Sequence, residues 1–282
     1  MGSKKQVVYV KTESNFDTCL PDPPYRLCLI NKSQILVMPG VPNVVSLGVR
    51  IINPGTYAFL LHARGNKKVF CHIGLVDPGY KGDVRLILMN KTTSPVVIAA
   101  RQLKVSLLAF CFAVPYVLPI NCPITLPQYP LDAGLDITLP QNLSIPPRTT
   151  AIVSISGCPN ISPKFIPVIL GRSGMASKGL GVKAVKWQSS PVLIKITNYS
   201  DVTHTFTAGA RICQVVFMHS DHFKFRFNIW SNIKLSNLGN FSWSKARFIA
   251  PGEDVDHSII DLTNTGDGDT RRGSMGFGSS GM

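Results

Sequence analysis

Three short apolar runs between residues 84 and 112 decide the fold of this chain: Val84-Arg-Leu-Ile-Leu-Met89, Val96-Val-Ile-Ala-Ala100 and Val105-Ser-Leu-Leu-Ala-Phe-Cys-Phe112. The first two runs are separated by Asn90-Lys-Thr-Thr-Ser-Pro95, whose residue types favour turns, and the last two by the polar segment Arg101-Gln-Leu-Lys104. Apolar runs of this length, bounded by turn residues, are typical of β-strands, because helices generally need ten or more residues. The stretch therefore predicts consecutive short strands.

The same rhythm continues through most of the chain. Further runs lie at 35–38, 44–52, 57–61, 150–155, 165–170, 192–197 and 212–218, and 23 Gly and 21 Pro separate them. We therefore expect an all-β protein made of barrel-like or jelly-roll-like units. One short helix is expected, near Ser94–Arg101 or near Ser173–Lys178.

Composition limits the class of protein and its compartment. The chain is 45% hydrophobic and 16% charged, as expected for a globular protein. No apolar run of about 18 residues predicts a membrane span, and the first residues lack the apolar core of a signal peptide. Seven scattered cysteines without a CxxC pair favour a reducing intracellular compartment over a zinc site. Nucleus and cytoplasm both stay open.

The formal net charge of +14 predicts an anionic partner. The basic residues are spread out, with no more than two in succession, and no nucleic-acid-binding motif accompanies them. We therefore expect a small anionic substrate, no stable nucleic-acid complex and no membrane partner.

The C-terminal tail is suited to cover a phosphorylated nucleoside. Four of the nine residues from Gly273 to Gly281 are Gly and three are Ser, so the segment cannot form a core and should be flexible. Its backbone amides can surround an anion, Arg272 can bind phosphate, and Phe277 offers a ring on which a base can stack. A plain Gly/Ser linker is the alternative.

Three internal segments favour the nucleotide hypothesis: Gly74-Leu-Val-Asp-Pro-Gly-Tyr-Lys-Gly82, Ala133-Gly-Leu-Asp-Ile137 and Gly171-Arg-Ser-Gly174. Together with Arg211-Ile-Cys-Gln214 and the tail, they resemble the five motifs of the dUTPase family. The GxxDxxYxG motif comes first here, whereas trimeric dUTPases carry it between the GRSG-type and RxxQ-type motifs. This order, in a chain about twice as long as a trimeric subunit, is similar to the monomeric herpesvirus enzymes, most closely the gammaherpesvirus kind.

The resemblance implies a fold, a reaction and a cofactor. It implies dUTPase-like β units and Mg²⁺-dependent hydrolysis of dUTP to dUMP and pyrophosphate, by water attack on the α-phosphorus. Such an activity limits uracil in DNA and supplies dUMP for thymidylate synthesis. It also implies that the hairpin backbone around Gly74 reads the uracil edge and that Tyr80 lies under the deoxyribose.

The residues themselves suggest roles in this chemistry. Asp77 can activate the water, although an Asp before Pro-Gly is often only a turn former. Asp136 is the expected acid for Mg²⁺, with Asp77 as a second, each directly or through metal-bound water. The neighbouring Asp132 is not expected to bind the metal. The expected substrate-binding set is Gly74, Tyr80, Arg172, Ser173, Gly174, Gln214, Arg272, Phe277, Gly278 and Ser279.

Two of these assignments leave alternatives. Gln214 either contacts a phosphate or is an outward-facing strand residue. Arg211 is expected to be structural and paired with an acid.

The two halves of the chain look related. Arg64, Asn90 and Arg101 in the first half match Arg172, Asn198 and Arg211 in the second by their spacing. We expect a duplicated β fold in which each half keeps part of one composite site, and hence a monomer. The expected boundaries are 1–114 for the first half, 115–132 for a Pro-rich connector, 133–218 for the second half, 219–270 for an extension and 271–282 for the tail.

Two other functions fit parts of the pattern. The related dCTP deaminases need a catalytic Glu near the hairpin, and no Glu lies between Gly74 and Asn90. A dUTPase-derived interaction or immune-modulating protein without catalysis is the remaining alternative, and any host partners stay open.

Overall fold

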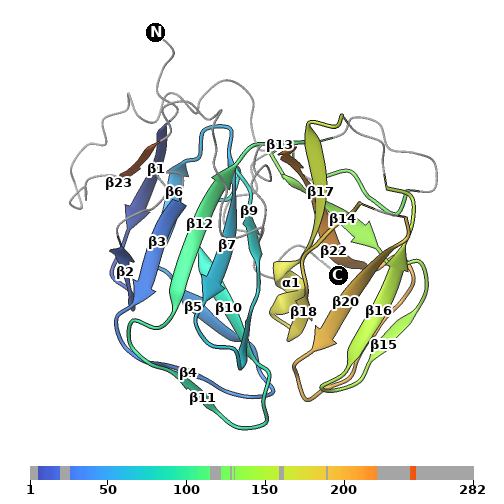
Figure 1. Cartoon of the computed structure of the whole chain (residues 1–282), viewed down its shortest axis with the longest axis horizontal. Coiled ribbons are helices and arrows are strands. Elements are labelled where there is room, and N and C mark those ends of the chain that lie inside the picture. The colour runs from blue at the N-terminus through green and yellow to red at the C-terminus, as the bar shows by residue number, and fades with distance from the viewer. Residues whose placement is uncertain are drawn as a thin grey trace.

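In the computed structural model the chain forms two β units that lie side by side (Figure 1). The structure describes residues 6–19, 26–114, 122–127, 129, 131–158, 162–188, 190–220 and 242–245. Within them a single four-residue helix accompanies 23 strands, which confirms the all-β prediction. In this described part no helix has the length and apolar character needed to cross a membrane.

The first unit contains twelve strands: β1 (Gln6–Lys11), β2 (Phe16–Cys19), β3 (Arg26–Asn31), β4 (Ile35–Val37), β5 (Asn43–Ser46), β6 (Val49–Asn53), β7 (Ala58–Arg64), β8 (Val69–Cys71), β9 (Gly74–Val76), β10 (Arg85–Asn90), β11 (Val96–Ile98) and β12 (Lys104–Phe110). The second contains β13 (Phe112–Ala113), β14 (Gly134–Thr138), β15 (Leu143–Ile145), β16 (Thr150–Ile155), β17 (Phe165–Gly171), α1 (Ser173–Ala176), β18 (Leu180–Val182), β19 (Val185–Lys186), β20 (Val192–Asn198), β21 (His204–Phe206) and β22 (Arg211–His219). β23 (Ser242–Lys245) returns to pair with β1.

The two units share their strand pairings, as a duplicated fold requires. The antiparallel pairs β3–β12, β4–β11, β5–β10, β7–β12, β7–β9 and β8–β10 of the first unit have counterparts in β14–β22, β15–β21, β16–β20, β17–β22, β17–β19 and β18–β20. The helix expected near Ser173 is α1, whereas the alternative near Ser94 contains β11.

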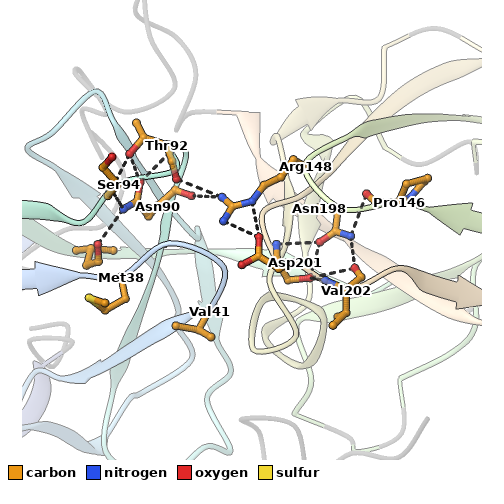
Figure 2. Close-up of polar contacts among 12 residues, drawn as sticks. Met38, Val41, Asn90, Thr92, Ser94, Pro146, Arg148, Asn198, Asp201 and Val202 are labelled. Carbon is orange, nitrogen blue, oxygen red and sulfur yellow. Dashed lines mark hydrogen bonds and ion pairs between the residues drawn. The ribbon is translucent and has the colours of Figure 1, made fainter.

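Two equivalent asparagines support the corresponding turns (Figure 2). The Asn90 amide donates to Val37 O (2.9 Å) and Ser94 O (2.8 Å), and its carbonyl oxygen accepts from Thr92 N–H (2.8 Å). The Asn198 amide donates to Ile145 O (3.0 Å) and Val202 O (2.7 Å), and its carbonyl oxygen accepts from Ser200 N–H (2.9 Å). Each side chain ties the end of one strand to a turn of the same length, so the spacing match reflects a repeated structural requirement.

The match between Arg101 and Arg211 is wrong. Arg101 N–H donates to Asn31 O (2.9 Å), and Gly209 N–H donates to Leu139 O (2.9 Å) at the equivalent turn. Both residues have positive φ, 61° for Arg101 and 84° for Gly209. The counterpart of Arg101 in the second unit is therefore Gly209, two residues before Arg211.

The outer face of the second unit packs on the first. Alternate residues of one strand point to opposite faces, and on β22 Cys213, Val215 and Phe217 lie in the second-unit core. Val216 and Met218 join the first-unit core, together with Val168 and Leu170 of β17. The face of β14, β22 and β17 that points to the first unit is thus the one on which side chains from both halves can meet.

A second contact joins the units at another point (Figure 2). Arg148 pairs with Asp201 at 2.8 Å and donates to Asn90 O and Thr92 O, both at 3.3 Å. It has positive φ, 60°, which is unusual for a residue with a side chain. Arg148 therefore fastens a second-unit loop to the turn after β10.

Candidate active site

The hairpin that carries Asp77 begins where β9 ends. Tyr80 N–H donates to Asp77 O at 3.0 Å, which closes a tight turn over Pro78 and Gly79. The Asp77 side chain is only 5% exposed, and its Oδ1 accepts from the Ala133 N–H of the second unit at 2.8 Å. This carboxylate from the first unit is thereby held against the start of β14.

The second unit contributes a cluster of one acid and two arginines. Asp136 on β14 accepts from Arg172 Nε at 2.7 Å through Oδ1 and from Arg211 Nη1 at 3.3 Å through Oδ2. Arg172 Nη1 also donates to Arg211 O at 3.1 Å. The cluster carries a net charge of +1, and each guanidinium has five N–H groups, so it can bind phosphate oxygens as well. The expectation that Arg211 pairs with an acid is confirmed.

Gln214 and Gly134 form the floor of the same site. The Gln214 amide donates to Gly171 O at 2.9 Å, which places its oxygen beside Gly134. A Cβ atom at Gly134 would lie 2.8 Å from Leu75 Cδ2 and closer still to Gln214 Oε1. Any side chain at position 134 would therefore require the ends of the Gln214 and Leu75 side chains to move, at the point where β14 and β22 meet the first unit.

A buried histidine of the first unit supports the strand end at Gly171. His72 is 3% exposed, and a Cβ atom at Gly171 would lie 3.2 Å from its Cε1. Burial lowers the pKa of His72 to about 4, so the ring is neutral at pH 7.

One cavity of about 80 Å³ lies between Asp77 and the acid–arginine cluster, and His72 is not part of its lining. It brings together six of the expected residues, which are Asp77, Asp136, Arg172, Ser173, Gly174 and Gln214. Asp77 comes from the first unit and the other five from the second, so the cavity is shared by the two halves. Arg172 immediately precedes α1, and Ser173 and Gly174 form its first turn, where helix amides have no partner among the helix carbonyls.

Two expected residues lie outside the lining of this cavity. Gly74 lies in β9 opposite Leu61. Tyr80 is buried in the first-unit core, where its hydroxyl donates to Asp83 O at 2.9 Å and its ring leaves no room for a side chain at Gly82. The tail residues Arg272, Phe277, Gly278 and Ser279 lie outside the described residues.

Residues of the Pro-rich connector also line the cavity. Thr125 N–H donates to Asp136 O at 2.9 Å, and Ile124 forms a bridge with Ile137, so this segment lies beside β14. The connector contributes Thr125, Leu126, Pro127, Tyr129 and Asp132 to the lining. Asp132, which the sequence analysis set aside, therefore belongs to the site. Its position four residues before Asp136 was the available signal.

The donor set limits how a metal ion can bind. Within the described residues, no group of three or more His, Cys, Asp or Glu side chains is arranged to hold one. The cavity carries three separate carboxylates, Asp77, Asp132 and Asp136. Mg²⁺ commonly binds to one or two carboxylates, water and substrate phosphates, and these residues fit that mode of binding.

Comparisons with known proteins identify the family. Residues 121–242 match the model of the dUTPase family. The deoxyuridine 5′-triphosphate nucleotidohydrolase of equine herpesvirus 2 is 40% identical, over 99% of this chain and 98% of its own length. The chain belongs to the dUTPase family. The saimiriine herpesvirus 2 protein of the same name is 35% identical, over the full length of both chains.

The predicted class of enzyme, a dUTP diphosphatase of the herpesvirus kind, is thus confirmed at the level of the family. A native EIAV dUTPase structure aligns with 40% of this chain and 94% of its own, at 21% identity and a TM-score of 0.33.

Proposed function

We propose that this dUTPase hydrolyses dUTP to dUMP and pyrophosphate, with Asp77 as the general base for a water that attacks the α-phosphorus. The observation that carries the proposal is the position of Asp77. A first-unit carboxylate is hydrogen-bonded to Ala133 N–H and shares a cavity with the second-unit arginines. A base positioned beside a phosphate-binding cluster can take the proton of the attacking water, which contributes about 10²–10⁴ in rate.

The phosphates bind to the second unit in this proposal. Arg172 and Arg211 supply charge and paired N–H donors, Ser173 and Gly174 supply a hydroxyl and backbone amides, and Gln214 supplies an amide. Because Asp136 already aligns both guanidinium groups, little ordering is required when the substrate arrives. This alignment makes Asp136 a positioning residue as well as an acid for the metal.

Mg²⁺ would be held by Asp136 and Asp77, directly or through water, and by the substrate phosphates, where it would neutralise the charge that develops on their oxygens. With both Asp136 oxygens engaged by arginines, we favour contact through water. Asp132 is the third carboxylate within reach of the cavity.

The remaining residues of the family motifs complete the substrate site in this proposal. The backbone around Gly74 reads the uracil edge, and Tyr80 fixes the hairpin beneath the deoxyribose. Arg272, Phe277, Gly278 and Ser279 close over the nucleotide as a lid. Each half of the chain holds part of one site, so we propose an intracellular monomer with one nucleotide per chain.

The test compares two Asp→Asn variants in one hairpin. Asp77→Asn should lower kcat by about 10²–10⁴ while binding of a non-hydrolysable dUTP analogue is retained. Asp83→Asn is the matched control, because Asp83 pairs with Arg50 at 3.0 Å outside the cavity. Pyrophosphate release from dUTP is measured with Mg²⁺ and with a chelator. Near-normal turnover of Asp77→Asn would refute its role, and no turnover by the unmodified chain would favour the non-enzymatic alternative.

A further inference from the structure

The first unit contains a counterpart of the phosphate-binding part of the active site. In the second unit Asp136, Gln214 and Leu170 are register partners across β14, β22 and β17. In the first unit Cys28, Ser106 and His62 are register partners across β3, β12 and β7. Arg172 follows Leu170 by two residues, as Arg64 follows His62. Cys28 thus occupies the place of Asp136, and Arg64 the place of Arg172.

Side chains on this face of the first unit line a separate cavity of about 180 Å³. Neighbouring strands of one sheet supply them, in the order β2, β3, β12 and β7. Alternate residues of a strand share a face, which brings together Arg26 with Cys28, Lys104 with Ser106, and His62 with Arg64. Cys19 of β2 lies opposite Cys28.

The charge of this cavity differs from that of the active site. Asp136 neutralises one of the two arginines in the second unit, whereas a thiol stands at its place in the first. Among the described residues, no carboxylate lies within 4.0 Å of Arg26, Arg64 or Lys104. Burial raises the pKa of Cys19, so that thiol adds no negative charge at pH 7.

His62 adds a neutral hydrogen-bonding group. Burial, together with the positive charges of Arg64 and Arg26, lowers its pKa to about 4. Arg26, His62 and Arg64 all line the same cavity, so one ligand can contact all three. The cavity presents three cations and a neutral imidazole, a set suited to a doubly charged phosphate group.

We propose that this first-unit cavity is a second, non-catalytic binding site for small phosphate-bearing anions, with pyrophosphate as the probe that fits its three cations. Position 28 carries a thiol in place of the acid, and no carboxylate among the described residues of the lining takes the role of Asp77, so we expect binding without hydrolysis. Two guanidinium forks on one face favour a compact polyanion over a single carboxylate. The proposal does not depend on the mechanism at Asp77.

The experiment is calorimetric titration of pyrophosphate into the full chain saturated with a non-hydrolysable dUTP analogue, which occupies the active site. One further site per chain is expected. Arg64→Gln and Lys104→Gln should each weaken it by about tenfold or more, because each removes a charged donor. Lys68→Gln removes the same charge from an exposed position on the same unit and should change affinity less than twofold.

Restoring the acid gives the sharpest comparison. Cys28→Asp should abolish binding by pairing with Arg64, as Asp136 pairs with Arg172, whereas Cys28→Ser should retain it. Circular dichroism and dUTP turnover establish that each variant is folded. Titration with dUMP and with inorganic phosphate separates a nucleotide site from a simple anion site. The proposal is overturned if analogue-saturated protein takes up no pyrophosphate, or if uptake is equal in Cys28→Asp and Cys28→Ser.

Discussion

Adding one methyl group at Gly134 tests whether the two halves meet at the site as tightly as the structure indicates. The new Cβ atom would lie 2.8 Å from Leu75 Cδ2, and nearer to Gln214 Oε1. Leu75 belongs to the first unit, whereas Gly134 and Gln214 belong to the second. Relief would require the Leu75 side chain to move or the halves to separate, and it would also require Gln214 to rotate, which would break its 2.9 Å hydrogen bond to Gly171 O.

The cost follows from three contributions. Overpacking costs about 1–3 kcal/mol, and loss of the Gln214 hydrogen bond costs about 0.5–1.5 kcal/mol. Replacing Gly by Ala restricts the unfolded chain and returns about 0.4–1 kcal/mol. Gly134→Ala should therefore lower the free energy of unfolding by about 1–4 kcal/mol, and it should raise KM for dUTP because Gln214 is displaced.

A double-mutant cycle with Gln214→Ala isolates the cause. Removing the Gln214 amide removes the nearest atom that the new methyl group would meet and leaves only the contact with Leu75, so Gly134→Ala should cost less in the Gln214→Ala background. We expect a coupling free energy of about 1–2 kcal/mol from urea unfolding, within the range for residues in contact. If the two substitutions were additive within about 0.5 kcal/mol, the close contact between Gly134 and Gln214 would be disproved.

Three further predictions concern the supports of the site. Arg148→Ala should lower the free energy of unfolding by about 1–2 kcal/mol through lost bonds to Asn90 and Thr92, and Arg148→Gly should be about 1 kcal/mol less harmful, since φ is 60°; equal urea midpoints would contradict this. His72 binds a proton in the unfolded chain below about pH 6.5 but in the folded one only near pH 4, so stability falls as pH drops through this window. Between pH 7 and pH 5 the free energy of unfolding of His72→Phe should therefore fall by about 2 kcal/mol less than that of the unmodified chain. Parallel pH profiles of the two proteins in unfolding titrations would contradict this. Asp136→Asn leaves two arginines without their acid and should both destabilise the fold and raise the Mg²⁺ concentration for half-maximal turnover; an unchanged Mg²⁺ requirement would remove Asp136 from the metal site.

Much of the fold could be predicted because strand periodicity and turn residues are local signals. The grouping of Asp136, Arg172 and Gln214 was accessible through motif resemblance, since spacing alone does not show that β14, β17 and β22 adjoin. The role of Arg211 as the partner of an acid was foreseen, but the identity of that acid was not. The pairing with Asp136 depends on the register of β14 against β22, which no short-range pattern reports.

The errors have equally specific causes. Residue spacing alone matched Arg101 to Arg211. In the structure Arg101 has a left-handed backbone conformation, and the equivalent residue of the second unit is Gly209. Asp132 was not expected to belong to the site, but it lines the cavity in a turn just before β14, where its N–H donates to Tyr129 O at 3.0 Å. Its place in the cavity depends on tertiary packing, for which the connector sequence carries no periodic signal.

The duplicated register separates the residues that maintain the fold from those that perform chemistry. Asn90 and Asn198 are the same residue because both turns need one side-chain amide that donates to a strand carbonyl and to a turn carbonyl and accepts from a turn N–H. Cys28 and Asp136 differ at equivalent places because nothing in the strand pairing depends on their side chains. Arg64 and Arg172 are alike, although within the described residues Arg172 has an acid partner and Arg64 has none. A cation retained without its acid leaves a positive cavity in the first unit, and the Cys28→Asp variant restores the acid that the second unit uses.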